Sequence, residues 1–375
     1  MSQYDTPQGA PPAGNPVDHP AGVVWADPQR ARAFARWLDS LVPVYGIQAA
    51  SARLASADAS FRRYLRVDNS SGSLIIMDAP PDKEDCRPFD AVARLMAQAG
   101  LRVPHVLDWE REAGFMLLSD LGHQTMMQAI EPAQPSANLG LYMRAVDALI
   151  TWQLATRPDV LPMYDAPVLR GEMELFSQWY VAQYRGHSLS GALRSTLDQA
   201  FDAIIADNLA WPSVYVHRDF MPRNLMLSPP AVGLSPTTQG LGVLDFQDAV
   251  YGPITYDIAS LMRDAFLSWD EDFVLDVTIR YWERARARGL PVGDDFGAFY
   301  RAVEWMGLQR HLKVAGIFAR LTLRDGKPRY LADTPRFIGY IRATCSRYRG
   351  LRPLLRLVDS IEGVQEAGGF AFGRV

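Results

Sequence analysis

The sequence predicts an α+β fold with a small, β-rich N-terminal portion and a larger, mainly helical C-terminal portion. Strand-like runs separated by turn residues dominate before residue 121, and apolar residues at helical spacing dominate after it. A chain of 375 residues that is 48% hydrophobic can bury one large core or two unequal lobes. We therefore expect a flexible tail at 1–22, an N-terminal lobe at 23–120 and a C-terminal lobe at 121–375.

The N-terminal portion begins with the tail and one helix. Five prolines within the first 20 residues are typical of a flexible segment. Apolar residues recur at helical spacing from Asp27 to Leu41, and Asp27 followed by Pro28 suits the start of a helix. After it we expect strands at Phe61–Val67, Leu74–Met77, His105–Trp109 and Phe115–Leu118, and a helix at about Pro88–Ala99 that ends at Gly100.

The C-terminal portion is predicted to be a series of helices interrupted by one hairpin. Helical spacing places the helices at about 138–156, 170–186, 190–208, 255–267, 271–288, 296–322 and 333–348. The charge-free stretch from Leu225 to Leu244 contains three prolines and several glycines. We therefore interpret it as a hairpin with a loop and not as a membrane span.

Composition argues against several classes of function. A net charge of −4 gives no overall field for nucleic acid or an anionic membrane, so we expect neither as a partner. Cys86 and Cys345 lie far apart without a CxxC motif, which favours a reducing compartment over a disulfide or a structural zinc site. The first Lys or Arg is Arg30, so the charged start of a secretory signal is missing. We expect a soluble, cytoplasmic protein with no obligate protein partner.

The most informative segment runs from Val214 to Leu227. It carries His217, Asp219 and Asn224 in the order and spacing of a phosphoryl-transfer loop, and Asp245 follows on the next apolar run. In such a loop an Asp accepts or orients the proton of the attacking hydroxyl, which makes Asp219 the candidate general base. An Asn and a second Asp hold Mg²⁺ on the phosphates of ATP, which makes Asn224 and Asp245 the candidate metal ligands.

Other residues near this segment are candidates for support. His217 and Arg218 belong to the same loop, and we expect His217 to brace it by hydrogen bonding and not to touch substrate. Asp257 begins the next predicted helix and could accept bonds from the loop backbone or from Arg218. Asp248 could assist the metal or cap the following element, and the sequence favours neither.

The N-terminal lobe is the expected nucleotide-binding lobe. The segment from Ala55 to Tyr64 is rich in small residues and lies where a turn could cover phosphates, with Arg62 and Arg63 available to contact them. A plain exposed turn is the competing interpretation. Lys83 is a further candidate cation, and the backbone of Ser119, Asp120 and Leu121 lies where adenine would be gripped.

These residues resemble the aminoglycoside phosphotransferase (choline kinase-like) superfamily. The resemblance lies in the His217–Asn224 loop, the Leu244–Phe246 motif and the Tyr256–Asp257 pair. Longer strings resemble one branch, the anomeric kinases that phosphorylate N-acetylmuramate and N-acetylglucosamine at C1 in peptidoglycan recycling: Ala57–Tyr64, Ile76–Pro81, Lys83–Phe89, Asp245–Pro253 and Gln309–Lys313. The resemblance implies a two-lobed, protein-kinase-like fold with a nucleotide cleft between the lobes, and ATP and Mg²⁺ as cofactors.

One position departs from the superfamily pattern. Met77 stands on the third strand of the small lobe, where a lysine usually holds the α- and β-phosphates, so other cations must take that part. A second feature bears on the sugar. Residues 301–330 carry seven Lys or Arg against two acids, which suits a sugar acid and would repel a polycationic aminoglycoside.

Within this basic segment Arg310 and Lys313 are the candidates for binding the lactyl carboxylate of N-acetylmuramate, because a helix places residues three apart on one face. An exposed basic helix face is the alternative. Trp305, Phe318 and Tyr330 could stack on a sugar, although core packing is the stronger expectation. Two other functions stay open: a kinase of another small alcohol, such as an aminoglycoside, choline or an amino-alcohol, and a nucleotide-binding pseudokinase.

Overall fold

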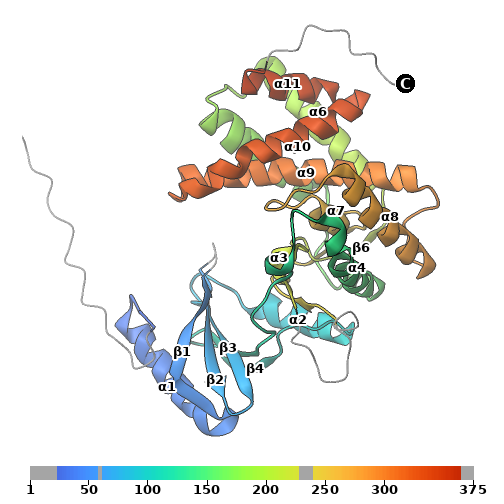
Figure 1. Cartoon of the computed structure of the whole chain (residues 1–375). Helices are drawn as coiled ribbons and strands as arrows, with labels where there is room; N and C mark the ends of the chain where they lie inside the picture. Colours follow the sequence, from blue (N-terminus) through green and yellow to red (C-terminus); the bar gives the residue numbers. More distant parts are fainter. Residues whose placement is uncertain (1–22, 58–60, 228–239, 365–375) are drawn as a thin grey trace, which may run out of the picture. The chain divides into compact units, whose positions relative to one another are not determined.

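The computed structural model describes residues 23–57, 61–227 and 240–364, which divide into two compact units (Figure 1). The first unit contains the described residues up to Ala91 together with 104–120, and the second contains 92–103 and the rest of the chain. The boundary therefore falls inside helix α2 (Arg87–Gln98). The predicted tail and most of the predicted hairpin loop lie outside the described residues.

The first unit is a five-stranded antiparallel sheet with the strand order β1-β2-β3-β5-β4. Its strands are β1 (Ile47–Ala57), β2 (Arg63–Asn69), β3 (Gly72–Asp78), β4 (Val106–Glu110) and β5 (Phe115–Ser119). The last four confirm the predicted strands. The sequence analysis missed β1, whose pairing with β2 is interrupted by two register shifts, so that its side chains do not alternate regularly.

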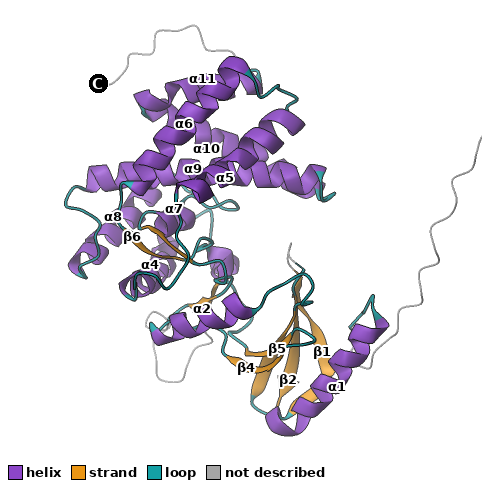
Figure 2. Cartoon of the chain, turned by 180° about the vertical axis from the view of Figure 1, so that it is seen from behind, coloured by secondary structure: helices purple, strands orange, loops and turns teal. Residues whose placement is uncertain are grey.

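Helix α1 (Pro28–Tyr45) covers one face of this sheet (Figure 2). As predicted, Asp27 caps its start by accepting the N–H of Gln29 at 2.8 Å. The helix runs beyond the predicted end and stops at Gly46, whose φ of 64° suits glycine. Trp37 stacks on Phe115 of β5 with 5.5 Å between ring centroids, which places the core of the unit between helix and sheet.

The second unit is mainly helical, as the sequence predicts. Its helices include α4 (Leu139–Leu154), α5 (Ala166–Leu175), α6 (Gly191–Leu209), α8 (Glu271–Ala287), α9 (Phe296–Leu323), α10 (Thr334–Arg347) and α11 (Arg352–Glu362). The two shortest α-helices among the described residues are α3 (Met126–Ala129) and α7 (Tyr256–Met262), and α5 continues as a π-helix, η2 (Phe176–Tyr184). Neither α11 nor the change to a π-helix was predicted.

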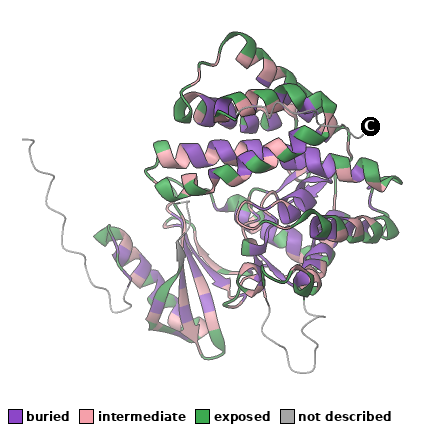
Figure 3. Cartoon of the chain, turned by 45° about the horizontal axis from the view of Figure 1, so that its top comes forward, coloured by how far each residue is buried: buried purple, intermediate pink, exposed green. Residues whose placement is uncertain are grey.

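Helix α9 is the most buried long helix of this unit, and α5, η2, α6, α7 and α10 pack on it. Figure 3 shows that buried residues line the inner helix faces and the strands, whereas exposed residues line the outer faces. At Gly316 the backbone of α9 meets the junction of α5 and η2 so closely that a Cβ would lie 2.2 Å from the carbonyl carbon of Leu175. None of the helices in the described ranges has the length and apolar character that crossing a membrane requires.

Two small antiparallel sheets support the segment singled out by the sequence. β6 (Ser213–Val216) pairs with β9 (Val250–Pro253), and β7 (Leu225–Met226) pairs with β8 (Gly242–Val243). The 217–224 loop runs from the end of β6 to the start of β7, and its last turn is the 3₁₀-helix η3 (Pro222–Asn224). These short strands fix both ends of the loop.

Candidate active site

The 217–224 loop brings three of the predicted residues together. The side-chain Nδ2 of Asn224 donates to the carbonyl oxygen of Asp219 at 2.9 Å and to Oδ2 of Asp245 at 3.3 Å. The backbone N–H of Leu244 donates to the carbonyl of Asn224 at 2.9 Å, which ties the two halves of the motif across neighbouring strands. Residues that are 21 positions apart therefore lie side by side, as the motif predicts.

Asn224 and Asp245 have the chemistry of a site for Mg²⁺. The pair offers an amide oxygen and a carboxylate, the hard ligands that Mg²⁺ prefers, and Mg²⁺ commonly takes few protein ligands and completes its shell with phosphate and water. Gln247 donates to Oδ1 of Asp245 at 3.0 Å and so orients the carboxylate. Asp245 has φ of 63°, an uncommon conformation for a residue with a side chain that points to a functional constraint.

His217 braces the loop from inside. It is fully buried, and its Nδ1 accepts the backbone N–H of Asp219 at 3.2 Å while its Nε2 donates to the carbonyl of Leu244 at 3.0 Å. Burial lowers the pKa of the imidazole, so the neutral ring with the proton on Nε2 satisfies both bonds. These contacts favour the bracing interpretation over contact with substrate.

Asp257 holds the backbone where the loop begins. Its two carboxylate oxygens accept the N–H groups of His217 at 2.7 Å and of Arg218 at 3.0 Å. Burial raises the pKa of this carboxyl to about 6, even though these backbone hydrogen bonds oppose the rise. Asp257 lies in the first turn of α7 and accepts hydrogen bonds from the loop backbone, as the sequence predicts.

Glu172 on α5 was missed by the sequence analysis and is the centre of a buried polar cluster behind the loop. It accepts hydrogen bonds from Arg218, from Lys313 at 2.8 Å, from Gln309 at 2.9 Å and from the hydroxyl of Tyr164. Burial alone would raise its pKa, but the charges of Lys313 and Arg218 hold the pKa at about 2. One sequence signal was available, because Glu172 falls on the same helix face as three buried apolar residues: Leu169, Met173 and Phe176.

Arg310 and Lys313 do share a face of α9, but that face is turned inward. Arg310 is 6% exposed, donates to the carbonyl of Arg218 at 2.6 Å and lies over the ring of Tyr256 at 4.7 Å. Lys313 is paired with Glu172. The alternative of an exposed basic face does not hold for these two residues. Both cations support the loop from behind, and their contacts leave their predicted role with a sugar carboxylate without structural support.

Two further arginines and the aromatic residues of the basic segment have contacts within the second unit. Arg301 forms an ion pair with Asp207, and Arg324 forms one with its neighbour Asp325. Trp305 and Phe318 are buried, so core packing is confirmed for both aromatic residues. Tyr330 packs its ring against Phe318 at 5.1 Å.

The predicted nucleotide cations lie in the first unit, and two of them are already paired. Arg62 forms an ion pair with Glu84 at 3.1 Å, and Arg63 forms one with Asp78 at 2.7 Å. The ammonium group of Lys83 lies 4.9 Å from the centroid of the Phe61 ring. Their contact with phosphates and the nucleotide cleft between the lobes both stay predictions.

The remaining predicted residues have the following places. Ser119 accepts the N–H of His105, Asp120 pairs with Arg66 at 2.6 Å, and the carbonyl of Leu121 accepts from Arg102. Met77, at the usual lysine position, is fully buried in β3. Asp248 is exposed and accepts a hydrogen bond from Gln247 at 3.3 Å, which decides neither of its two predicted roles.

The sequence matches the profile of the phosphotransferase enzyme family over residues 51–291. Among curated relatives, the N-acetylmuramate/N-acetylglucosamine kinase of Neisseria meningitidis serogroup B is 46% identical over 348 residues, which is 92% of this chain and 100% of that protein. The protein of the same name from Pseudomonas aeruginosa is also 46% identical, over 91% of this chain and 100% of its own length.

Solved structures agree on the fold. A choline/ethanolamine kinase family protein from Mesorhizobium loti has a TM-score of 0.58 at 15% identity and covers 88% of this chain and 99% of its own. The GDP complex of aminoglycoside 2'-phosphotransferase-IIIa has a TM-score of 0.55 at 14% identity, over 84% of this chain and 99% of its own. The protein-kinase-like fold expected from the sequence is confirmed. With a family match over most of its length and relatives at 46% identity, the chain belongs to the phosphotransferase enzyme family.

Proposed function

We propose that this chain is an ATP- and Mg²⁺-dependent kinase that phosphorylates the C1 hydroxyl of N-acetylmuramate and N-acetylglucosamine. The observation that carries the proposal is the 46% identity, over 92% of the chain, to a relative named for both sugars. The grouping of Asp219, Asn224 and Asp245 supports it with a site of the right chemistry. We assign the reaction to peptidoglycan recycling in the cytoplasm, because both sugars are cell-wall components.

In this proposal each residue has one task. The carboxylate of Asp219 accepts the proton of the C1 hydroxyl as that oxygen bonds to the γ-phosphorus and the bond to the leaving ADP oxygen breaks. An anomeric hydroxyl is more acidic than an ordinary alcohol, so a carboxylate is a sufficient base. Asn224 and Asp245 would hold Mg²⁺, which neutralises phosphate charge when bound. His217 and Asp257 keep the backbone of Asp219 in place.

A kinase of an aminoglycoside, choline or an amino-alcohol is the alternative function. A cationic substrate would need carboxylates beside the attacking hydroxyl. Arg310 and Lys313, which pack behind the loop, are cations. The carboxylates there are already engaged, because Arg218 and Lys313 share that of Glu172 and the loop backbone donates to that of Asp257. A nucleotide-binding pseudokinase is disfavoured because the three reaction residues are intact and lie together.

The test is a substrate screen with the purified full chain. We expect ATP consumption with N-acetylmuramate and N-acetylglucosamine and none above background with kanamycin or choline. Phosphorus NMR of the product should show a phosphate on C1, and mild acid should release it, as it does from a glycosyl phosphate. Turnover of choline or kanamycin, with both sugars inert, would overturn the proposal.

A further inference from the structure

The two proposed sugars differ in one charged group, and that difference restricts which residue can bind it. N-acetylmuramate carries a lactyl carboxylate, and N-acetylglucosamine has a hydroxyl in its place. A buried cation reserved for the carboxylate would stay desolvated and unpaired when N-acetylglucosamine binds, which is strongly unfavourable. An exposed cation is hydrated in that case, so a protein that accepts both sugars needs an exposed one.

The cations that pack behind the 217–224 loop already have partners. Arg218 and Lys313 share the carboxylate of Glu172. Arg310 donates to the carbonyl of Arg218 and lies over the ring of Tyr256. A substrate carboxylate at any of these cations would therefore compete with the partner that the cation already has.

Arg223 differs from these three cations. It lies within the loop, immediately before Asn224 and four positions after Asp219, and it is exposed. Its guanidinium lies over the ring of Phe266, 4.6 Å from the centroid. Its charge acts on the buried carboxylate of Asp264, but among the residues that the structure describes no carboxylate lies within ion-pair distance of its guanidinium. Its hydrogen-bond donors can therefore turn to a ligand.

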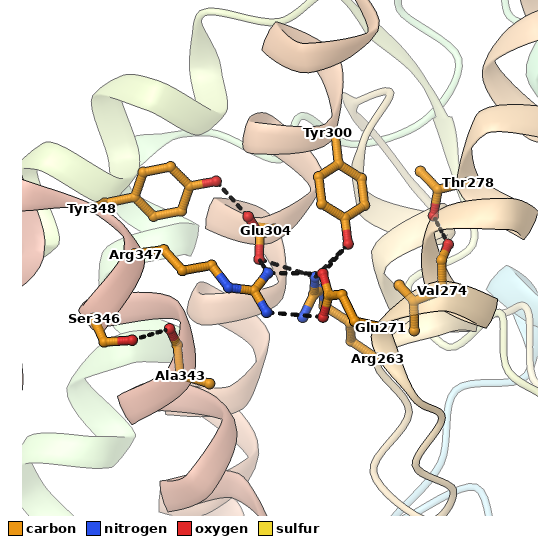
Figure 4. Close-up of polar contacts among 10 residues, drawn as sticks. All are labelled: Arg263, Glu271, Val274, Thr278, Tyr300, Glu304, Ala343, Ser346, Arg347 and Tyr348. Atoms are coloured by element: carbon orange, nitrogen blue, oxygen red, sulfur yellow. Dashed lines mark hydrogen bonds and ion pairs between the residues drawn. The ribbon is translucent and has the colours of Figure 1, made fainter. Parts of the chain in front are cut away.

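The aromatic ring under Arg223 is itself held in place. Oδ1 of Asp264 accepts the N–H of Phe266 at 3.1 Å, and Nε2 of His311 donates to the carbonyl of Arg263 at 3.2 Å. The guanidinium of Arg263 is fixed in a network that joins the end of α7 to three other helices (Figure 4). The other members of that network are Glu271, Tyr300, Glu304, Arg347 and Tyr348.

We propose that Arg223 binds the lactyl carboxylate of N-acetylmuramate and is the residue that distinguishes the two sugars. The inference rests on the proposed function. A guanidinium presents paired N–H groups that match a carboxylate. Because Arg223 already stacks on Phe266, its side chain loses less conformational freedom when it binds a ligand. Its exposure explains why the neutral sugar is also accepted.

The test compares Arg223→Gln with Arg111→Gln. Arg111 is the matched control because it is also exposed and lies over an aromatic ring, that of Trp109 at 4.0 Å, but belongs to the first unit. The measured quantity is kcat/KM for N-acetylmuramate divided by kcat/KM for N-acetylglucosamine. We expect this ratio to fall about three- to tenfold in R223Q, as for an exposed charge-assisted pair, and to stay unchanged in R111Q.

A neutral substrate completes the experiment. The lactyl amide of N-acetylmuramate keeps the shape of the group and removes its charge, so R223Q should no longer differ from the wild type with this substrate. Arg223→Lys, which keeps the charge, should recover part of the ratio. An equal loss on all substrates, or an unchanged ratio in R223Q, would overturn the inference and leave the proposed function intact. Failure of the wild type to phosphorylate either sugar would instead overturn the proposed function.

Discussion

Glu172 and Arg218 form an ion pair across 46 residues of sequence, directly behind the backbone of the 217–224 loop. Arg218 has φ of 77°, in the left-handed region that side-chain-bearing residues rarely adopt. The carbonyl of the same residue accepts from Arg310 and its N–H donates to Asp257. Side chain and backbone of Arg218 are thus fixed from three directions, which sets the position of the next residue, Asp219.

We predict that Glu172→Gln lowers kcat at least tenfold and changes the KM for sugar little. The loss of the carboxylate leaves Arg218 and Lys313 facing each other without a counter-charge, and breaking a buried pair costs about 3–5 kcal/mol of stability. Steady-state kinetics and chemical denaturation measure both effects. Glu174→Gln is the matched control, because Glu174 lies on the same helix and pairs with Arg194 instead. A stability loss with kcat intact would assign Glu172 to the fold alone.

We predict that Asp219→Asn removes most phosphoryl transfer while nucleotide binding survives. The substitution keeps the shape of the side chain but removes the proton acceptor, and loss of a general base typically lowers the rate by about 10²–10⁴-fold. Single-turnover kinetics with ATP and either sugar measure the rate. Asp202→Asn serves as the control, because Asp202 is exposed on α6 and pairs with Arg170. A turnover near that of the wild type would remove Asp219 from its proposed role.

Asp245→Ala should abolish activity for a different reason. The proposed Mg²⁺ site loses its carboxylate, so the affinity for ATP should fall in the presence of Mg²⁺ and change little in its absence. Isothermal titration calorimetry with and without Mg²⁺ measures the two affinities for ATP separately. Equal affinities for MgATP in the wild type and the variant would show that Asp245 is not a metal ligand.

Asp264 gives a prediction about pH. Burial raises its pKa to about 6, although Arg310 from α9 and Arg223 from the loop oppose the rise. The folded protein therefore holds a proton on Asp264 that the unfolded chain releases near pH 4, and this contribution to stability is lost as pH rises from about 4 to about 6. Asp264→Asn has no such loss.

We expect the stability of D264N relative to the wild type to increase between pH 4 and pH 6 and then to level off. A rise of about two pKa units corresponds to roughly 3 kcal/mol as an upper limit. Urea denaturation at several pH values measures the difference, and taking the difference cancels the titration of buried His217, His311 and Asp257. If the difference in stability between D264N and the wild type did not depend on pH, the pKa of the Asp264 carboxyl would not be raised in the folded protein.

The site follows from the sequence where the chemistry is local. The spacing of Asp219, Asn224 and Asp245 was sufficient to predict that these residues lie together, because the short strands on either side pair with each other. The helices of the second unit were also predictable, since each buries one periodic apolar face. β1 was not, because small and polar residues with two register shifts leave no regular alternation to detect.

Long-range contacts were beyond the sequence. Spacing showed that Arg310 and Lys313 share a helix face, but it could not show that the face turns toward Glu172 and Arg218. Glu172 belongs to no local motif, because its charged partners, Arg218 and Lys313, lie 46 and 141 residues away. Charge counting alone could not reveal these internal contacts, and the predicted role of the two cations with a ligand stays a prediction.

The contact at Gly316 has a consequence for how related chains can diverge. Because the backbone of α9 touches the end of α5 at Leu175 without a side chain between them, the spacing of the two helices is set by main-chain atoms. Glu172 precedes that contact by one helical turn on α5, and Lys313 precedes it by a similar distance on α9. Apolar side chains elsewhere between the helices can then be exchanged over evolutionary time while this ion pair keeps its register. A substitution that adds a side chain at position 316 would instead wedge the two helices apart.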